Sequence, residues 1–289
     1  MRLFTFVQLE LPWELGPADG RYLLRRTDGA QEGEPEHVVV LRTVGAIRRG
    51  MFGRRARTKP TDAEPAAVPL ARATVVDPVP LGKEAQAKAW LRELDPEREA
   101  HAATNVLNRV LFSQRVASAA PHVHEISPQQ ALVLRAGYGE GEQVADGLWR
   151  DARELVLASG RGRGRRRAAA LRPQERLALL LSGRERPLLC EELTLRARAD
   201  LDAGRLGLAA VGLERAYAAA LVELPDERRA DLGARVAELA RLAGGVEEVA
   251  TAALGGEREL DEPLLRQALE RLAAALRARI ARGLGSPGP

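Results

Sequence analysis

The stretch HVVVLRT, His37–Thr43, is the clearest strand signal in the chain and predicts that its first half contains a sheet. Four consecutive apolar residues, three of them valine, favour extended backbone because β-branched side chains pack well on a pleated surface. Leu3–Leu11 (LFTFVQLEL) and Arg21–Arg26 (RYLLRR) precede it as similar segments, and Ala71–Val79 (ARATVVDPV) follows. Turn and loop residues between the first three segments predict an antiparallel meander.

Two segments with helical signals follow these predicted strands in the chain, and two more predicted strands come after them. Gly82–Leu94 is predicted as a helix. Asp95 is the predicted N-cap of a second, longer helix, because Pro96 occupies its first position and acidic residues its first turn. Further strands are predicted at Gln130–Ala136 and Arg153–Leu157.

The arginine-rich segment RGRGRRR, Arg161–Arg167, separates two parts of different character. Residues 1–158 are predicted to form a mixed domain, with a long loop at 48–69 that is basic and then rich in Pro and Ala. Residues 159–172 form the predicted linker, and 173–284 carry helical signals only. The predicted helices are Pro173–Leu181, Leu188–Ala203, Leu206–Leu224, Asp226–Ala243, Val246–Ala253 and Asp261–Arg282. The expected fold class is therefore α+β: an N-terminal mixed domain with antiparallel strands plus a helical pair, followed by an all-helical C-terminal domain.

One predicted hairpin, at about 190–224, has a pattern of its own. In DLDAGRLGLAAVGLERAYAAAL, Asp200–Leu221, a glycine permits a tight turn and small alanines let two helices approach. The pattern resembles the tetratricopeptide repeat, and the matching positions are Leu201, Gly204, Leu206, Ala209, Leu213 and Ala216. The resemblance covers about one repeat, departs from the pattern at Arg196 and Ala197, and has no clear copy about 34 residues on. It implies a module that packs on its neighbours and holds a peptide; the alternative is an ordinary helical hairpin.

The net charge of +4 is unevenly distributed. Residues 48–59 and 160–172 each contain six basic residues and no acid, so the rest of the chain carries −8. The arginines predicted to contact phosphates are Arg54, Arg55, Arg57, Arg161, Arg163, Arg165, Arg166 and Arg167. Only Phe52 offers an aromatic ring near either segment, so stacking platforms for bases are missing. The alternative is a polar linker in a chain where 41 of 44 basic residues are arginine, as GC-rich codon usage produces.

Three motifs resemble chemical sites but lack residues that the chemistry requires. His122 and His124 are close in sequence, but a zinc site needs three or four protein ligands and no cysteine is near. Gly137–Gly141 (GYGEG) lacks the cation and the following helix of a phosphate loop, and is expected to be a strand–loop–strand connection. Cys190, the only cysteine, precedes two glutamates that raise a thiol pKa, and is expected to be buried at a helix start. No metal, cofactor or catalytic residue is predicted.

These features favour a non-enzymatic interaction or adaptor protein whose helical domain binds a protein partner. The alternative is a weak, sequence-nonspecific nucleic-acid-binding protein that uses the arginine-rich loops, and the third hypothesis is an enzyme of unknown reaction. The amphipathic last helix, with leucines at 265, 269, 272 and 276, either caps the helical stack or mediates self-association. No signal-peptide pattern and no long apolar stretch are found, so a cytoplasmic location is expected.

Overall fold

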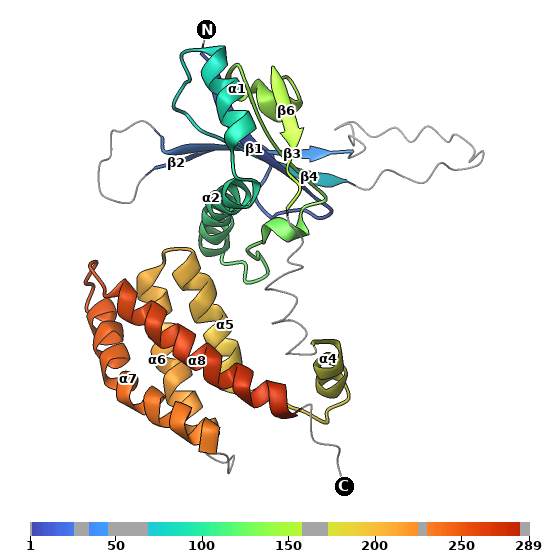
Figure 1. Ribbon diagram of the computed structural model, residues 1–289. Helices are drawn as coiled ribbons and strands as arrows, with labels where there is room; N and C mark the ends of the chain where they lie inside the picture. The colour runs from blue at the N-terminus through green and yellow to red at the C-terminus, as the bar shows by residue number, and fades with distance from the viewer. Residues whose placement is uncertain (1, 26–34, 46–68, 158–172, 225–229, 284–289) are drawn as a thin grey trace, which may run out of the picture. The chain divides into compact units, whose positions relative to one another are not determined.

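The computed structural model describes residues 2–25, 35–45, 69–157, 173–224 and 230–283. These residues form two compact units, one within Met1–Ala158 and the other within Ser159–Pro289. The first, the N-terminal unit, contains a six-stranded antiparallel sheet and two α-helices (Figure 1). The described part of the second, the helical unit, contains helices only. The predicted α+β fold class is confirmed. Among the described helices, none has both the length and the apolar character needed to span a bilayer.

The sheet has the strand order β2-β3-β4-β1-β5-β6. Its strands are β1 (Phe4–Leu11), β2 (Gly20–Leu24), β3 (His37–Val44), β4 (Leu70–Val76), β5 (Val133–Gly139) and β6 (Asp151–Glu154). The predicted meander of the first three strands is wrong, because β1 pairs with β4 and β5 while β2, β3 and β4 form the meander. β1 is buried from Thr5 to Leu11, and a strand buried on both faces belongs in the centre of a sheet rather than at an edge.

Side chains alternate between the two faces of the sheet. One face is covered by α1 (Glu84–Glu93) and α2 (Pro96–Ala117), where Leu9 and Val39 share a core with Leu107 of α2. The opposite face carries a smaller core that includes the short 3₁₀ segment η2 (Gly141–Asp146). Its buried members are Phe6, Val38, Val40, Val76, Val144 and Ala145.

The predicted N-cap of α2 is present. The Asp95 carboxylate accepts hydrogen bonds from the backbone N–H groups of Glu97 at 3.0 Å and Arg98 at 3.2 Å. Further along α2, the buried Asn108 side chain donates to the Ile126 carbonyl and accepts from the Ile126 N–H, each at 2.9 Å. Because these two bonds satisfy both backbone groups of Ile126, they tie the segment after α2 to that helix.

A polar network lies on the sheet face opposite the helices. Gln8 Nε2 donates to Thr74 Oγ1 at 2.9 Å. The Glu10 carboxylate lies 2.9 Å from Arg72 Nη2 and 3.7 Å from Arg135 Nη2. Since Arg72 belongs to β4 and Arg135 to β5, one glutamate links the three central strands electrostatically.

Gly137 on β5 stands where the sheet leaves no room for a side chain. A Cβ atom there would lie 2.5 Å from the Asp151 carbonyl oxygen and 2.8 Å from the Phe6 ring. β5 ends at Gly139 and continues through η2 into β6. Glycine at position 137 therefore permits close packing of β5 against β6 and β1.

The helical unit consists of α4 (Pro173–Leu181), α5 (Leu189–Asp202), α6 (Leu206–Glu223), α7 (Ala230–Leu254) and α8 (Glu262–Gly283). α5 and α6 form a helical hairpin whose turn contains Gly204 at φ +71°. α6 packs against α7, α7 packs against α8, and α8 returns to α5 and α6 (Figure 1). The tetratricopeptide-like positions Leu201, Ala209, Leu213 and Ala216 are all buried in this core.

The prediction of two separate helices at Asp226–Ala243 and Val246–Ala253 is wrong. α7 runs continuously through Gly244 and Gly245, and its predicted start at Asp226 lies outside the described residues. A Cβ atom at Gly245 would lie 3.2 Å from Leu264 Cδ2 of α8. Gly245 thus lets α8 approach α7 closely, and neither glycine breaks the helix.

The leucine stripe of α8 is covered within the helical unit. Leu265, Leu269, Leu272 and Leu276 all belong to the buried core that α5, α6 and α7 share. Because this stripe is buried, it is not available for self-association in the folded unit. The arrangement favours the capping role over the self-association alternative.

Replacing Gly137 with alanine should lower the free energy of unfolding of the N-terminal unit by about 2 kcal/mol, because the added methyl group meets a backbone carbonyl. Urea unfolding followed by tryptophan fluorescence measures this, since all three tryptophans, at positions 13, 90 and 149, lie in this unit. Gly82→Ala is the matched control, because nothing lies within 4 Å of its added Cβ. Equal stability of the two variants would show that β5 and β6 are not packed as described.

Leu272→Ala should destabilise the helical unit by about 3 kcal/mol, because it leaves a cavity beneath α8. Leu254→Ala, at a side chain 74% exposed, should change the stability by less than about 0.5 kcal/mol. Urea unfolding followed by far-ultraviolet circular dichroism measures the free energy of unfolding of each variant and of the wild type. A Leu272→Ala protein as stable as the control would mean that α8 does not form part of the core.

Candidate functional site

The arginines predicted to contact nucleic acid all lie outside the described residues. Arg54, Arg55 and Arg57 fall within 46–68, and Arg161, Arg163, Arg165, Arg166 and Arg167 fall within 158–172. The first described element after the second segment is α4, which begins at Pro173. α4 and the residues that hold it form the candidate site.

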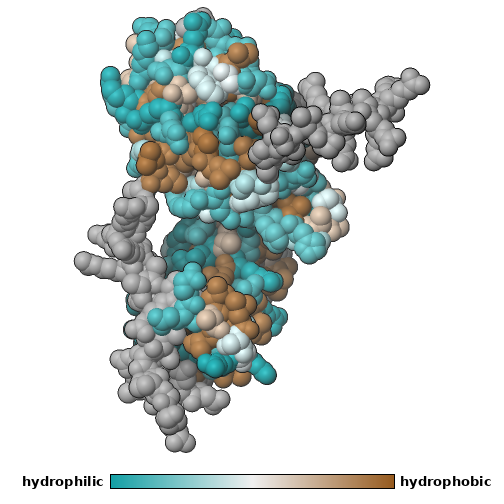
Figure 2. Space-filling view, turned by 90° about the vertical axis from the view of Figure 1, so that its right-hand side faces the viewer, coloured by the Kyte–Doolittle hydropathy of each residue, from teal (hydrophilic) through white to brown (hydrophobic). Residues whose placement is uncertain are grey.

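α4 has the sequence PQERLALLL and presents apolar side chains to solvent. We call Leu177, Leu179, Leu180 and Leu181 the α4 leucine patch. Leu177 is 47% exposed and Leu181 80%, and the other two are partly exposed. Within the described residues, none of the four belongs to a hydrophobic core. The space-filling view shows apolar surface gathered on the helical unit where α4 lies (Figure 2).

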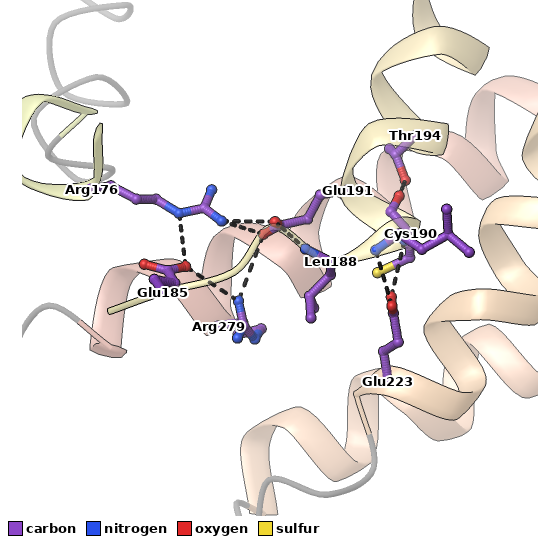
Figure 3. Close-up of polar contacts among 9 residues, drawn as sticks. Arg176, Glu185, Leu188, Cys190, Glu191, Thr194, Glu223 and Arg279 are labelled. Atoms are coloured by element: carbon purple, nitrogen blue, oxygen red, sulfur yellow. Dashed lines mark hydrogen bonds and ion pairs between the residues drawn. The ribbon is translucent and has the colours of Figure 1, made fainter. Parts of the chain in front are cut away.

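Arg176 anchors α4 to the rest of the helical unit through its charge. Its Nη2 lies 2.7 and 2.8 Å from the two carboxylate oxygens of Glu191, and its Nε donates to Glu185 at 3.1 Å (Figure 3). Arg279 of α8 approaches the same carboxylates at 3.7 Å from Glu191 and 3.8 Å from Glu185. These four residues, which we call the Arg176 cluster, join α4, the loop after it, α5 and α8.

The Arg176 cluster is largely shielded from water. The side chains of Arg176 and Glu191 are 18% and 11% exposed. Burial lowers the pKa of Arg176, but its hydrogen bonds and charge interactions with Glu191 and Glu185 outweigh burial, so its pKa lies above the ordinary value. Hydrogen bonds between ionised partners are strong, and removing one partner leaves a buried charge uncompensated. α4 is thus held by charge, while Leu177 and Leu181 are exposed and Leu179 and Leu180 are partly exposed.

Two carboxylates cap the N-terminus of α5. Glu191 accepts a hydrogen bond from the Leu188 N–H at 3.1 Å, and Glu223 of α6 accepts from the N–H groups of Leu189 and Cys190, each at 3.0 Å (Figure 3). Burial raises the pKa of Glu223, but the hydrogen bonds from Cys190 and Leu189 outweigh it, and the pKa lies below its ordinary value. A carboxylate at a helix N-terminus also interacts favourably with the helix dipole. Glu223 therefore fixes the end of α6 to the start of α5.

Cys190 lies in this arrangement at the start of α5, and its side chain is buried as expected. Burial, followed by hydrogen bonding and charge repulsion from Glu223, raises the pKa of its thiol. The sequence prediction attributed the raised pKa to Glu191 and Glu192, whereas the main charged neighbour is Glu223, 33 residues away in sequence. A thiol that stays protonated at neutral pH is a poor nucleophile, so Cys190 has a structural role.

His122 and His124 line one cavity of about 310 Å³, together with Trp13. The neighbouring Glu125 carboxylate lies 3.6 Å from Arg115 Nη2. In the part of the chain that the structure describes, no three His, Cys, Asp or Glu side chains are grouped as metal ligands. The two histidines share this cavity with Glu14 and Glu125.

The Arg176 cluster was missed in the sequence because its members come from separate parts of the helical unit. Only Glu191 has a local signal, since it stands at the position of a capping glutamate, three residues after Leu188. Arg279 has no such signal, because α6 and α7 separate it from Glu191 in the chain, and α5 also separates it from Glu185. Comparison with known proteins gives this site no precedent: no family model matches the chain, and no curated protein or solved structure was found to be similar.

Proposed function

We propose that the protein is a non-enzymatic interaction protein whose helical unit binds a partner protein through the α4 leucine patch. The observation that supports this most directly is that all four leucines of a nine-residue helix lie outside the described cores. Burying one leucine contributes about 2 kcal/mol, so a partner that covers the patch gains substantial free energy. Since the Arg176 cluster already holds α4 in place, less conformational entropy is lost on binding than for a free peptide.

The charges near the patch favour an acidic partner. Arg184 and Arg186, in the loop after α4, are exposed, and neither forms an ion pair with another described residue. Six more arginines precede α4 within 160–172. Complementary charge steers association and selects among partners. The occupant that fits is an amphipathic acidic segment whose apolar side chains recur at helical spacing.

Nucleic acid is the second candidate, because the same arginines would pair with phosphates. This alternative gives no role to the leucine patch, since binding to a phosphate backbone needs cations and stacking needs aromatic rings. The two candidates therefore predict different effects of replacing leucines and of removing nucleic acid.

The Leu177→Ser/Leu181→Ser variant should recover about tenfold less partner protein than the wild type, or less still. A loss of about 1.4 kcal/mol in binding free energy weakens the affinity tenfold. Its stability should change by less than about 0.5 kcal/mol, because neither side chain belongs to a core. The measurement is affinity purification of the full chain from nuclease-treated lysate, with quantitative mass spectrometry. Leu254→Ser, at another exposed leucine, is the matched control and should keep the partner.

Three outcomes would contradict this proposal. The first is the same set of proteins recovered with the double variant as with the wild type. The second is a partner that is recovered only without nuclease, which would assign binding to nucleic acid. The third is that light scattering shows a dimer for the wild type and a monomer for the double variant, which would assign the patch to a second copy of the chain.

If the partner is acidic, the Arg184→Ser/Arg186→Ser variant should bind it more weakly, and the binding should depend less on salt concentration.

A further inference from the structure

A cavity of about 180 Å³ lies in the N-terminal unit between the sheet and its two covering helices. It is lined by side chains of β1, β3 and β4 and by residues of α1 and α2. The buried apolar lining is Val7, Val75, Ala103 and Val106. Asp77 and Ala102, which also line it, are exposed, so the cavity opens to solvent on their side.

Three polar side chains meet at the sheet end of this cavity. Thr5 is the second residue of β1, His37 is the first residue of β3, and Asp77 directly follows β4. The registers of β4 with its two neighbours place these three residues side by side, and the Asp77 N–H donates to the Thr5 carbonyl at 3.0 Å. Adjacent residues on neighbouring strands have Cβ atoms about 5 Å apart, so one small ligand can reach all three side chains.

Thr5 presents its hydroxyl to this cavity. The residue is 8% exposed and lines the cavity, and no hydrogen bond joins its hydroxyl to another described residue. The hydroxyl oxygen is not among the fully buried atoms without a partner, so it is accessible from the cavity. Burial lowers the pKa of His37, which also lines the cavity, so its imidazole is uncharged at neutral pH and can accept a hydrogen bond. Polar groups shielded from water are normally hydrogen-bonded, and here the Thr5 hydroxyl and the His37 imidazole line one cavity.

The charge around the cavity is negative. Asp77 and Glu99 contribute two carboxylates to its lining. No Lys or Arg lines the cavity: Arg109 is paired with Glu36 at 2.8 Å, and Arg98, 81% exposed, forms an ion pair with Glu99 at 4.0 Å. An anionic or purely apolar ligand would therefore be disfavoured.

We propose that this cavity binds the ammonium group of a small free amine. An ammonium group has three N–H donors and no acceptor, which matches a lining of two carboxylates, the Thr5 hydroxyl and a neutral imidazole. The indole ring of Trp90, also in the lining, offers a face for a cation–π contact. The valine lining accommodates a short alkyl chain. This binding activity is independent of the protein-binding role of the helical unit.

Fluorine NMR of the full chain labelled with 5-fluorotryptophan tests the proposal, with n-butylammonium chloride as the probe. The chain has three tryptophans, and Trp90→Phe assigns the resonance of Trp90. The probe should shift the Trp90 signal saturably, with a dissociation constant on the order of 1 mM for so small a ligand. The signals of Trp13 and Trp149, which do not line this cavity, should stay unchanged. Sodium butyrate and 1-butanol should leave all three signals in place.

Isosteric variants identify the interactions. Asp77→Asn and Glu99→Gln should each raise the dissociation constant about tenfold, and Thr5→Val about fivefold through the lost acceptor. Glu97→Gln, an exposed residue in the first turn of α2 outside the cavity, is the matched control and should have no effect. Unchanged Trp13 and Trp149 signals verify that each variant is folded.

The proposal is overturned if butylammonium does not shift the Trp90 signal, if butanol or butyrate shifts it equally, or if both carboxamide variants bind butylammonium like the control. Tighter binding of Nα-acetyl-lysine methylamide, whose ε-ammonium group represents a lysine side chain of a protein, than of butylammonium would contradict a small-molecule amine as the ligand.

Discussion

A single buried glutamate in each unit holds two arginines, and the local architecture of both units depends on this contact. Glu10 binds arginines from the two strands that flank β1, and Glu191 binds arginines from α4 and α8. The guanidinium group carries several donors in a fixed plane, so two arginines can share one carboxylate where two ammonium groups would fit poorly. Arginine makes up 41 of the 44 basic residues, and at these two points the excess of arginine has a structural use. Removing Glu10 would take from Arg72 and Arg135 the acceptor that they share, whereas removing Glu191 would leave Arg176 and Arg279 paired with Glu185.

The contact at Glu191 also determines what the helical unit presents to solvent. A nine-residue helix is too short to persist alone in water, and the leucines of α4 do not contribute to a described core. Ion pairs therefore replace apolar packing as the attachment of this helix. This division leaves the α4 leucine patch available to a partner, and the neighbouring exposed arginines favour an acidic one. The N-terminal unit differs, because its α1 and α2 are packed on the sheet and the cavity between them and the sheet opens to solvent only beside Asp77 and Ala102.

The sequence predicted those features that depend on local chemistry. Apolar runs indicated the strands, and Asp95 marked the start of α2. The central position of β1 was not predictable from neighbouring turns, because it depends on pairing with strands far along the chain. The continuity of α7 through Gly244 and Gly245 was not predictable either, because the close approach of Leu264 in α8 to Gly245 is a contact between different helices. The Arg176 cluster, and the cavity lined by Thr5 and His37, are composed of residues distant in sequence, so only the folded chain brings these residues together.

Hydrogen exchange of the α4 amides, Leu177–Leu181, tests most directly the claim that ion pairs alone hold this helix in place. The comparison is between the wild type and Arg176→Met, which retains helix propensity and side-chain length but removes the charge. Arg196→Met, at an arginine on α5 whose side chain is 72% exposed, is the matched control. The α4 amides should be protected from exchange in the wild type and in the control. In Arg176→Met they should lose this protection, while the amides of α5–α8 stay protected. Equal protection of α4 in all three proteins would contradict it, because apolar contacts would then hold the helix and its leucines would not be free.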